Sequence, residues 1–198
     1  MSVLTLASTS TSRQVVLRAA GIAFEVRPSG VDEDALHGLP PDEHVRVLAT
    51  AKALAVANTL TDAVVLGCDS MLLVDGTVLG KPRDAAQALA WWEHRANTAA
   101  ELLTGHCLVE VTGGRTGRMT DAVVRSTVHF AAPTPDEIRA YVATGEPLTA
   151  AGAFTIEGHG APFMKGITGD YTNVLGLSVP TLRTMLKELD LSITDFWT

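Results

Sequence analysis

The sequence predicts an α/β fold in which helices flank a mixed β-sheet. Two long strand-like runs, residues 102–111 and 119–131, are joined through a glycine-rich turn, which predicts antiparallel neighbours. Helical patterns alternate with shorter apolar runs elsewhere, as crossover connections do. The 198 residues, of which 46% are apolar and 19% charged, suit a single domain over residues 1–198, or two small lobes that share a sheet.

The N-terminal part of the chain alternates aliphatic, β-branched runs with helical patterns. Gly21 ends the first helix, since glycine tolerates the left-handed backbone that follows a helix. Lys52 lies on the apolar stripe of the second helix, where a lysine must snorkel or meet an acid. We expect strands at residues 3–7, 24–27, 63–67 and 71–74, and helices at 13–20 and 42–58.

The C-terminal part also alternates helical and strand patterns, separated by turn and capping signals. An Asp-Gly turn at 75–76 predicts a hairpin, and Thr134 to Glu137 form a capping box that starts a helix. Trp91 and Trp92 are expected to be exposed and are a candidate dimer surface. We expect helices at residues 84–95, 134–145 and 178–189, a strand at 151–156, and a glycine-rich loop around a short strand at 158–169.

Composition bounds the class of protein. The net charge of −7 argues against general nucleic-acid binding, which needs a basic surface. Apolar runs fall short of the roughly 18–20 residues that span a bilayer, and the first residues resemble a strand more than a signal peptide. The two cysteines, Cys68 and Cys107, have no disulfide or zinc spacing, so we expect a reduced, cytoplasmic protein without a membrane partner.

Asp69 is the first candidate for chemistry. It interrupts apolar runs, and a lone acid there is costly to bury unless a cation or metal needs it. Lys81 returns after the Asp-Gly turn, and Pro82 favours an extended backbone that would aim it rigidly. Together they predict a site for an anionic substrate, although an edge aspartate beside a turn lysine would give the same pattern.

The hydroxyl-rich turn before the first helix is the second candidate. Ser8, Ser10, Ser12 and Arg13 bring hydroxyls, a guanidinium and helix N–H groups within one turn, which suits a phosphate. A serine-rich cap beside a surface arginine is the alternative. The turn is not a P-loop, because its glycines and Gly-Lys-Ser/Thr ending are missing.

Two further acidic positions have open interpretations. The run at residues 32–34 is either a solvated face or supplies one of its carboxylates, together with Asp69, to a divalent cation. Glu157 follows an expected strand and points either into a cleft or into water.

These motifs, in this order, resemble the Maf family of nucleoside triphosphate pyrophosphatases over nearly the whole chain. The resemblance rests on Leu6-Ala7-Ser8-Thr9-Ser10 with Arg13, Val31-Asp32-Glu33, Ala51-Lys52-Ala53, Gly67-Cys68-Asp69, Leu79-Gly80-Lys81-Pro82, Thr144-Gly145-Glu146-Pro147, Ala151-Gly152-Ala153-Phe154 and Asn173-Val174-Leu175-Gly176-Leu177.

The resemblance implies an elongated mixed sheet with two lobes around a deep cleft, commonly as a homodimer. It implies hydrolysis of a nucleoside triphosphate to the monophosphate and pyrophosphate, with Mg²⁺ or Mn²⁺ as cofactor and house-cleaning of non-standard nucleotides as the role. Asp69 matches the proton acceptor. The other matched positions, which handle phosphate and metal, are Ser8, Arg13, Glu33, Lys52 and Lys81.

Specificity positions depart from the branches of the family. Thr11, Ser12, Ser70 and Glu157 all differ from the branch resembling dTTP/UTP pyrophosphatases. The branch acting on 7-methyl-GTP shares the glutamate at 157 but differs at the other positions, so the combination fits neither branch. An ionised glutamate only accepts hydrogen bonds, so Glu157 favours base edges that offer donors, as guanine and cytosine do. Two alternatives stay open: a non-catalytic nucleotide-binding regulator of cell division, and a nucleotidyltransferase or kinase.

Overall fold

The computed structural model describes residues 3–33 and 38–198. Its seven-stranded sheet has the order β2-β1-β3-β5-β6-β7, with β4 paired to β3. The strands are β1 (Leu4–Leu6), β2 (Phe24–Val26), β3 (Ala63–Val74), β4 (Thr77–Leu79), β5 (Ala99–Thr112), β6 (Arg115–Phe130) and β7 (Met164–Thr168). β1 pairs in parallel with β2 and β3, whereas the β3–β4 and β6–β7 pairs are antiparallel, so the predicted mixed sheet is confirmed.

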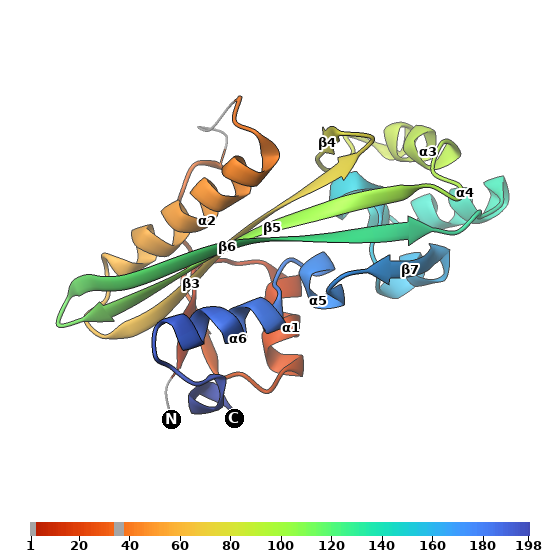
Figure 1. The fold of residues 1–198 in the computed structure, drawn as a ribbon. Coiled ribbons are helices and arrows are strands. Elements are labelled where there is room, and N and C mark those ends of the chain that lie inside the picture. Colours follow the sequence, from red (N-terminus) through yellow and green to blue (C-terminus); the bar gives the residue numbers. More distant parts are fainter. Residues whose placement is uncertain (1–2, 34–37) are drawn as a thin grey trace. The chain divides into compact units, whose positions relative to one another are not determined.

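Helices connect these strands (Figure 1). The α-helices are α1 (Thr11–Ala19), α2 (Pro41–Ala57), α3 (Ala85–Glu93), α4 (Pro135–Ala143), α5 (Tyr171–Val174) and α6 (Val179–Glu188). The 3₁₀ helices are η2 (Glu146–Thr149), η3 (Ala151–Ala153), η4 (Gly158–Phe163) and η5 (Ile193–Phe196). The capping box predicted at Thr134 is present at the start of α4.

The chain forms two compact units that interleave along the sequence. The first contains residues 1–70, 103–124 and 175–198, and the second contains residues 71–102 and 125–174. The long strands β3, β5 and β6 each contribute residues to both units.

In the first unit, helices cover both faces of the strands, with α2 on one face and α1 and α6 on the other (Figure 1). Side chains alternate between the faces because successive strand residues point in opposite directions. Val65 packs with α2, whereas Leu66 and Cys68 pack with α1 and α6. This alternation decides which helix each polar residue further along β3 will meet.

Two glycines allow α2 to lie close to the strands. A Cβ atom on Gly67 would be 2.1 Å from the carbonyl oxygen of Ala49, and one on Gly105 would be 2.1 Å from that of Val45. Any side chain at either position would therefore push the α2 backbone away from the strands.

The second unit has its own core, which is rich in aromatic residues. Trp92 packs edge-on against Phe130, Tyr141 and Phe163, with ring centroids 5.6–5.9 Å apart. Phe130 also packs at right angles against Phe154, at 5.0 Å. The core lies between α3, α4 and the adjoining ends of the strands.

Three sequence expectations need correction. β3 is one continuous strand over residues 63–74, so Asp69 lies within a strand. Residues 151–156 form no strand, because Gly152 (φ 67°) and Ala153 (φ 58°) adopt left-handed backbone that a strand cannot contain. Trp92 is buried and Trp91 is half-buried against the same core, so this pair is not an exposed surface.

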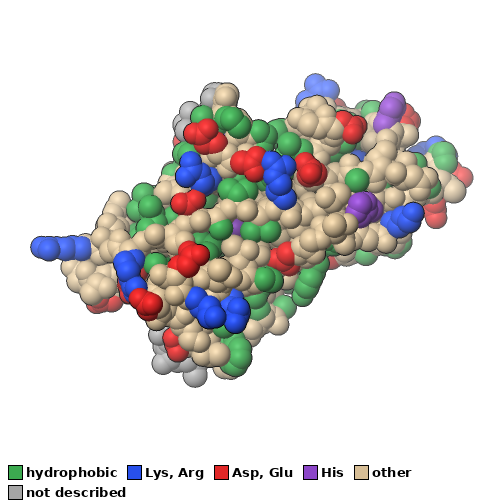
Figure 2. Space-filling view, in the orientation of Figure 1, with side chains coloured by type: hydrophobic (Ala, Val, Ile, Leu, Met, Phe, Trp, Pro, Cys, Tyr) green, Lys and Arg blue, Asp and Glu red, His purple; other side chains and the backbone are tan. Residues whose placement is uncertain are grey.

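In the described ranges, no helix is long and apolar enough to cross a membrane. On the face shown in Figure 2, Lys and Arg side chains stand among Asp and Glu side chains and do not gather in one patch. The ion pairs of the described residues mix the two signs as well, since Arg118 contacts both Glu110 and Asp190.

Candidate functional site

Lys52 and Asp69 form a buried ion pair in the first unit. Asp69 lies two and four residues after Gly67 and Val65, so it shares their face of β3 and meets α2. There Lys52 Nζ lies 2.8 Å from Asp69 Oδ1, with only 4% and 6% of the two residues exposed. This contact explains the lysine on an apolar helix stripe, because each buried charge is offset by the other.

A second carboxylate reaches the same ammonium. Glu33 Oε1 lies 2.6 Å from Lys52 Nζ, although the Glu33 side chain itself is largely exposed. Glu33 and Asp69 therefore converge on the Lys52 ammonium, whereas the divalent cation that they are predicted to share stays a prediction. Asp34, which the sequence placed in the same acidic run, lies outside the described residues.

On the opposite face of β3, Ser70 meets Arg13 from α1. Arg13 is 8% exposed and donates from Nη2 to Ser70 Oγ and from Nη1 to Ser8 Oγ, both at 3.1 Å. Its Nε donates to the carbonyl oxygen of Gly176 at 2.8 Å. Among the described residues, no carboxylate pairs with Arg13. Within the described part of the chain, this buried guanidinium is thus held by neutral hydroxyl and carbonyl groups.

The other predicted hydroxyls lie at the start of α1. Ser10 is the N-cap, and its Oγ accepts from the backbone N–H of Arg13 at 3.5 Å. Its own N–H donates to Ser8 Oγ at 3.2 Å. Ser12 lies in the first turn and is half-buried. The turn therefore shapes the helix start that presents Ser8 and Arg13.

A polar cavity of about 190 Å³ adjoins these groups. Ser8, Glu33 and Lys52 line it, so it joins the hydroxyl turn to the ion-pair cluster. The remaining lining residues are Ala7, Thr9 and the segment Pro28, Ser29, Gly30 and Val31.

Lys81 and Glu157 belong to the second unit. Lys81 is exposed, beside the buried Pro82, and follows Gly80, whose carbonyl oxygen accepts from the backbone N–H of Gly152 at 2.9 Å. Glu157 is exposed and immediately precedes η4. Both therefore lie on irregular backbone and present charged side chains to solvent.

The segment that contains Glu157 is held in place by hydrogen bonds to a second acid, Glu146. Glu146 accepts hydrogen bonds from the Thr155 hydroxyl and from the backbone N–H groups of His159 and Gly160, at 2.5–3.0 Å. Burial acts to raise the pKa of Glu146, but these bonds, with one from the His159 ring, outweigh it and lower the pKa to about 2. Glu146 thus fixes the residues on both sides of Glu157.

The cysteines do not contribute a nucleophile. Both are free and buried, and burial raises the pKa of Cys68 to about 12 and that of Cys107 to about 11. Their thiols therefore stay protonated at neutral pH, where the thiolate is the reactive form.

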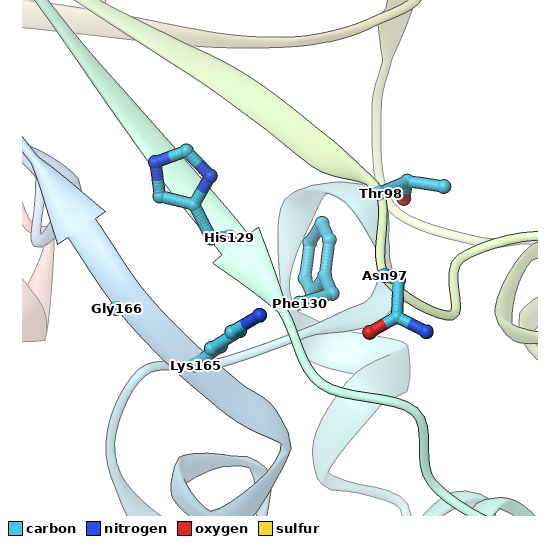
Figure 3. A pocket seen from close by; sticks show the side chains of 6 residues that line it. All are labelled: Asn97, Thr98, His129, Phe130, Lys165 and Gly166. Atoms are coloured by element: carbon cyan, nitrogen blue, oxygen red, sulfur yellow. The ribbon is translucent and has the colours of Figure 1, made fainter.

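A separate pocket of the second unit, of about 240 Å³, contains none of the predicted residues (Figure 3). His129 of β6 lies on one side of it, and its Nε2 is 2.8 Å from the hydroxyl of Thr168. Lys165 of β7 and Asn97 also line it. The pocket has no buried charge comparable to that of Lys52 or Arg13.

Sequence reasoning gave no role to two residues that complete the Arg13 site. Thr104 lies 3.0 Å from Ser70 through its hydroxyl, and Gly176 supplies a carbonyl. Gly176 has a φ of 93°, and a Cβ atom there would be 3.3 Å from Arg13 Nε. The glycine in the Asn173–Leu177 motif was the available signal, since close approach of a side chain to backbone favours glycine.

Comparison with known proteins identifies the family. The Maf-like protein family matches residues 3–189, so the chain belongs to this family. Proteins named nucleoside triphosphate pyrophosphatase are similar along the whole length. The one from Mycobacterium sp. (strain JLS) is 49% identical over 98% of this chain and 97% of its own. The one from Streptomyces coelicolor is 49% identical over 98% and 94%.

A relative with the same name from Rhodococcus erythropolis is 45% identical over 100% of this chain and 97% of its own. A solved structure titled nucleoside-triphosphatase / dITP/XTP pyrophosphatase, from Mycobacterium abscessus, covers 94% of the chain. Its identity of 14% and TM-score of 0.39 are too low to support an inference.

Proposed function

We propose that this protein hydrolyses a nucleoside triphosphate to the nucleoside monophosphate and pyrophosphate, with Asp69 as the proton acceptor. The observation that carries the proposal is a buried Lys52–Asp69 pair in the same unit as a buried Arg13 that no carboxylate of residues 3–33 and 38–198 pairs with. The full-length relatives named nucleoside triphosphate pyrophosphatase support it.

Phosphate oxygens are the groups that the hydroxyl turn suits best. Arg13 already has its charge buried and its orientation fixed, so binding an anion requires little reorganisation. Ser8 links the guanidinium to the cavity, and the first N–H groups of α1 add their partial positive charge. A triphosphate would therefore lie against the start of α1.

Asp69 has the position of a general base. Lys52 contacts Oδ1, so Oδ2 is the oxygen that can accept a proton from the attacking water. Hydrolysis at the α-phosphorus places negative charge on the departing pyrophosphate, and Lys52 and Lys81 are the lysines that we propose to offset it.

The residues of this site also fit a divalent metal ion. Glu33 and Asp69 converge on a single cation, Lys52, and they supply the hard oxygen donors that Mg²⁺ and Mn²⁺ prefer. In the described part of the chain no cluster of three or more His, Cys, Asp or Glu residues forms a protein-only metal site. We therefore propose that these two carboxylates hold the metal together with substrate phosphates, where it would neutralise charge and acidify water.

Glu157 is the residue that we propose to contact the base. Its exposed carboxylate accepts hydrogen bonds and donates none when ionised, which favours guanine or cytosine over uracil or thymine. Ser70 and Ser12 are the other substrate-contacting positions in the proposal.

We further propose a homodimer in the cytoplasm. The free, buried cysteines suit a reducing compartment, and a nucleoside triphosphate substrate is abundant there. House-cleaning of non-standard nucleotides is the role that we propose for the reaction.

The decisive experiment measures pyrophosphate release from UTP, dTTP, CTP, GTP and 7-methyl-GTP with Mg²⁺ or Mn²⁺. Asp69→Asn should lower release to less than a tenth of the wild-type rate while nucleotide binding is kept or tightened, because a carboxylate near the phosphates is removed. The matched control is Asp75→Asn, an exposed turn residue that should keep full activity.

Other outcomes separate the rival functions. Nucleotide binding without release, by wild type and variant alike, would indicate a binding regulator. Turnover that appears only with a second acceptor substrate would indicate a transferase or kinase. Asp69→Asn retaining more than a tenth of the rate would exclude Asp69 as the base.

A further inference from the structure

Arg95 is a buried cation in the second unit that the proposed reaction does not use. It follows α3, is 2% exposed, and forms no ion pair with the carboxylates of residues 3–33 and 38–198. Burial lowers the pKa of its guanidinium to about 10, so the charged form is retained at neutral pH. Holding a charge in a core without a counter-ion is costly, so its surroundings must offset the cost.

Aromatic faces and one carbonyl group provide that offset. The Arg95 Cζ atom lies 5.3 Å from the ring centroid of Trp92, 5.0 Å from that of Phe130 and 5.8 Å from that of Phe154. These are cation–π distances. The Nη1 group donates a hydrogen bond to the carbonyl oxygen of Gly152. The guanidinium is therefore held in one orientation and directed at one backbone group.

That backbone group belongs to a strained turn. Gly152 and Ala153 both have left-handed φ values, 67° and 58°, and an alanine in this region costs on the order of 1–2 kcal/mol. The indole N–H of Trp92 donates to the Ala153 carbonyl oxygen at 2.7 Å, beside the Arg95 bond to Gly152. Two successive carbonyl groups of the turn are thus fixed by two buried donors.

The Gly152–Ala153 turn also holds the loop that carries Lys81. The backbone N–H of Gly152 donates to the carbonyl oxygen of Gly80 at 2.9 Å, and Lys81 is the next residue. Pro82 is buried and restricts Lys81 to extended backbone. Hydrogen bonds therefore run without a break from Arg95 through Gly152 to the residue before the lysine.

We propose that Arg95 is a positioning residue for Lys81, acting through Gly152 and Gly80. The proposal rests on the proposed function, in which Lys81 offsets charge on the substrate phosphates. Arg95 is not a catalytic residue, since it lies in the core and its contacts are to aromatic rings and backbone.

Glu157 has a separate anchor, which makes the proposal specific. The segment around Glu157 is fixed by Glu146 through Thr155, His159 and Gly160. Loss of the Arg95 contact should therefore displace the lysine and spare the residue that reads the base. The expected signature is a fall in activity of the same size for every nucleotide.

The test compares Arg95→Met, Lys81→Ala and the double variant by pyrophosphate release. Methionine keeps an apolar chain among the rings but cannot donate to Gly152. We expect Arg95→Met to lower kcat/KM by about tenfold to a hundredfold, as displacement of a charge by about 1 Å does. The double variant should lose no more than Lys81→Ala alone, because both changes remove the same contribution.

Two further variants guard against simple loss of structure. Arg95→Lys retains a cation and should recover part of the activity. Ile138→Ala, in the same core but outside the hydrogen-bond chain, is the matched control for destabilisation and should keep wild-type kcat/KM below its Tm. If Arg95→Met does not fold, Trp92→Phe, which removes the neighbouring donor together with part of the buried ring, replaces it in the double variant and is compared with Ile138→Ala for the loss of packing.

Each contrary outcome is distinct. Losses that multiply in the double variant, or a changed order of preference among bases, would overturn the positioning role. Equal losses in Arg95→Met and Ile138→Ala would show a purely structural arginine. Wild-type protein that releases no pyrophosphate would instead reject the proposed function itself.

Discussion

The two units hold their predicted site residues on different kinds of backbone. In the first unit, Asp69, Ser70 and Lys52 lie on a regular strand and a regular helix, and strand alternation alone sends Asp69 to α2 and Ser70 to α1. In the second unit, Lys81 and Glu157 lie on turns. These turns have no regular side-chain periodicity. Hydrogen bonds from Arg95 and to Glu146 hold their backbone in place instead. A regular element positions a side chain by its own geometry, whereas an irregular one needs side chains elsewhere to hold it.

The largest effect is expected at Gly67, because the close packing of α2 on β3, and with it the Lys52–Asp69 contact, depends on this glycine. Gly67→Ala would place a Cβ atom 2.1 Å from the Ala49 carbonyl oxygen and push α2, with Lys52, away from Asp69. We expect a loss of about 3 kcal/mol in the free energy of unfolding, measured by urea denaturation, and a parallel loss of pyrophosphate release. Gly166→Ala, where nothing lies within 4 Å, is the matched control and should change neither. Normal activity in Gly67→Ala would show that the Lys52–Asp69 contact tolerates movement of the helix.

The irregular arrangement is tested at Glu146. Glu146→Gln places an amide N–H₂ group where donors from Thr155, His159 or Gly160 require an acceptor. We expect a loss on the order of 2 kcal/mol in unfolding free energy at neutral pH, together with a changed preference among bases as the segment around Glu157 loosens.

The pH dependence of that loss has a definite sign. The pKa of Glu146 is lowered from an ordinary 4.5 to about 2, so its stabilising contribution is present above pH 4.5 and disappears as pH falls towards 2. The stability difference between wild type and Glu146→Gln, followed by denaturation from pH 6 to pH 2.5, should therefore shrink. A difference that stays constant over this range would show that the carboxylate charge is not responsible.

The smallest expected effect is at Glu157 itself. Glu157→Gln replaces an acceptor with a group that both donates and accepts, which matches the alternating edge of uracil and thymine. We expect relative kcat/KM for UTP and dTTP to rise by about threefold to tenfold, with stability unchanged because the side chain is exposed. Unchanged relative kcat/KM across the bases would remove Glu157 from the proposed base contact.

The sequence predicts the regular elements of this molecule better than its irregular segments. The mixed sheet, the capped helices and the pairing of Lys52 with an acid were all predictable, because periodicity and the cost of burying charge determine them. The strand expected at 151–156 was wrong, since the left-handed Ala153 depends on donors from distant Trp92 and Arg95. The sequence likewise gave no sign that Trp92 is core.

Within the first site, Thr104 and Gly176 were missed for a related reason. Both complete the surroundings of Arg13 from segments far away along the chain, and neither carries a charge that would draw attention in a sequence. Contacts of this kind depend on tertiary packing, which local pattern does not encode.

The interleaving of the two units sets an order for assembly during synthesis. Arg13 emerges early from the ribosome, yet its Nε partner, Gly176, and the packing of α6 against β1 belong to the last segment of the first unit. The second unit ends at residue 174, so all of its residues are synthesised before that last segment. The surroundings of the Arg13 guanidinium, which we propose to bind phosphate, therefore stay incomplete until the last segment is made, so a chain that ends before Gly176 lacks this part of the proposed site.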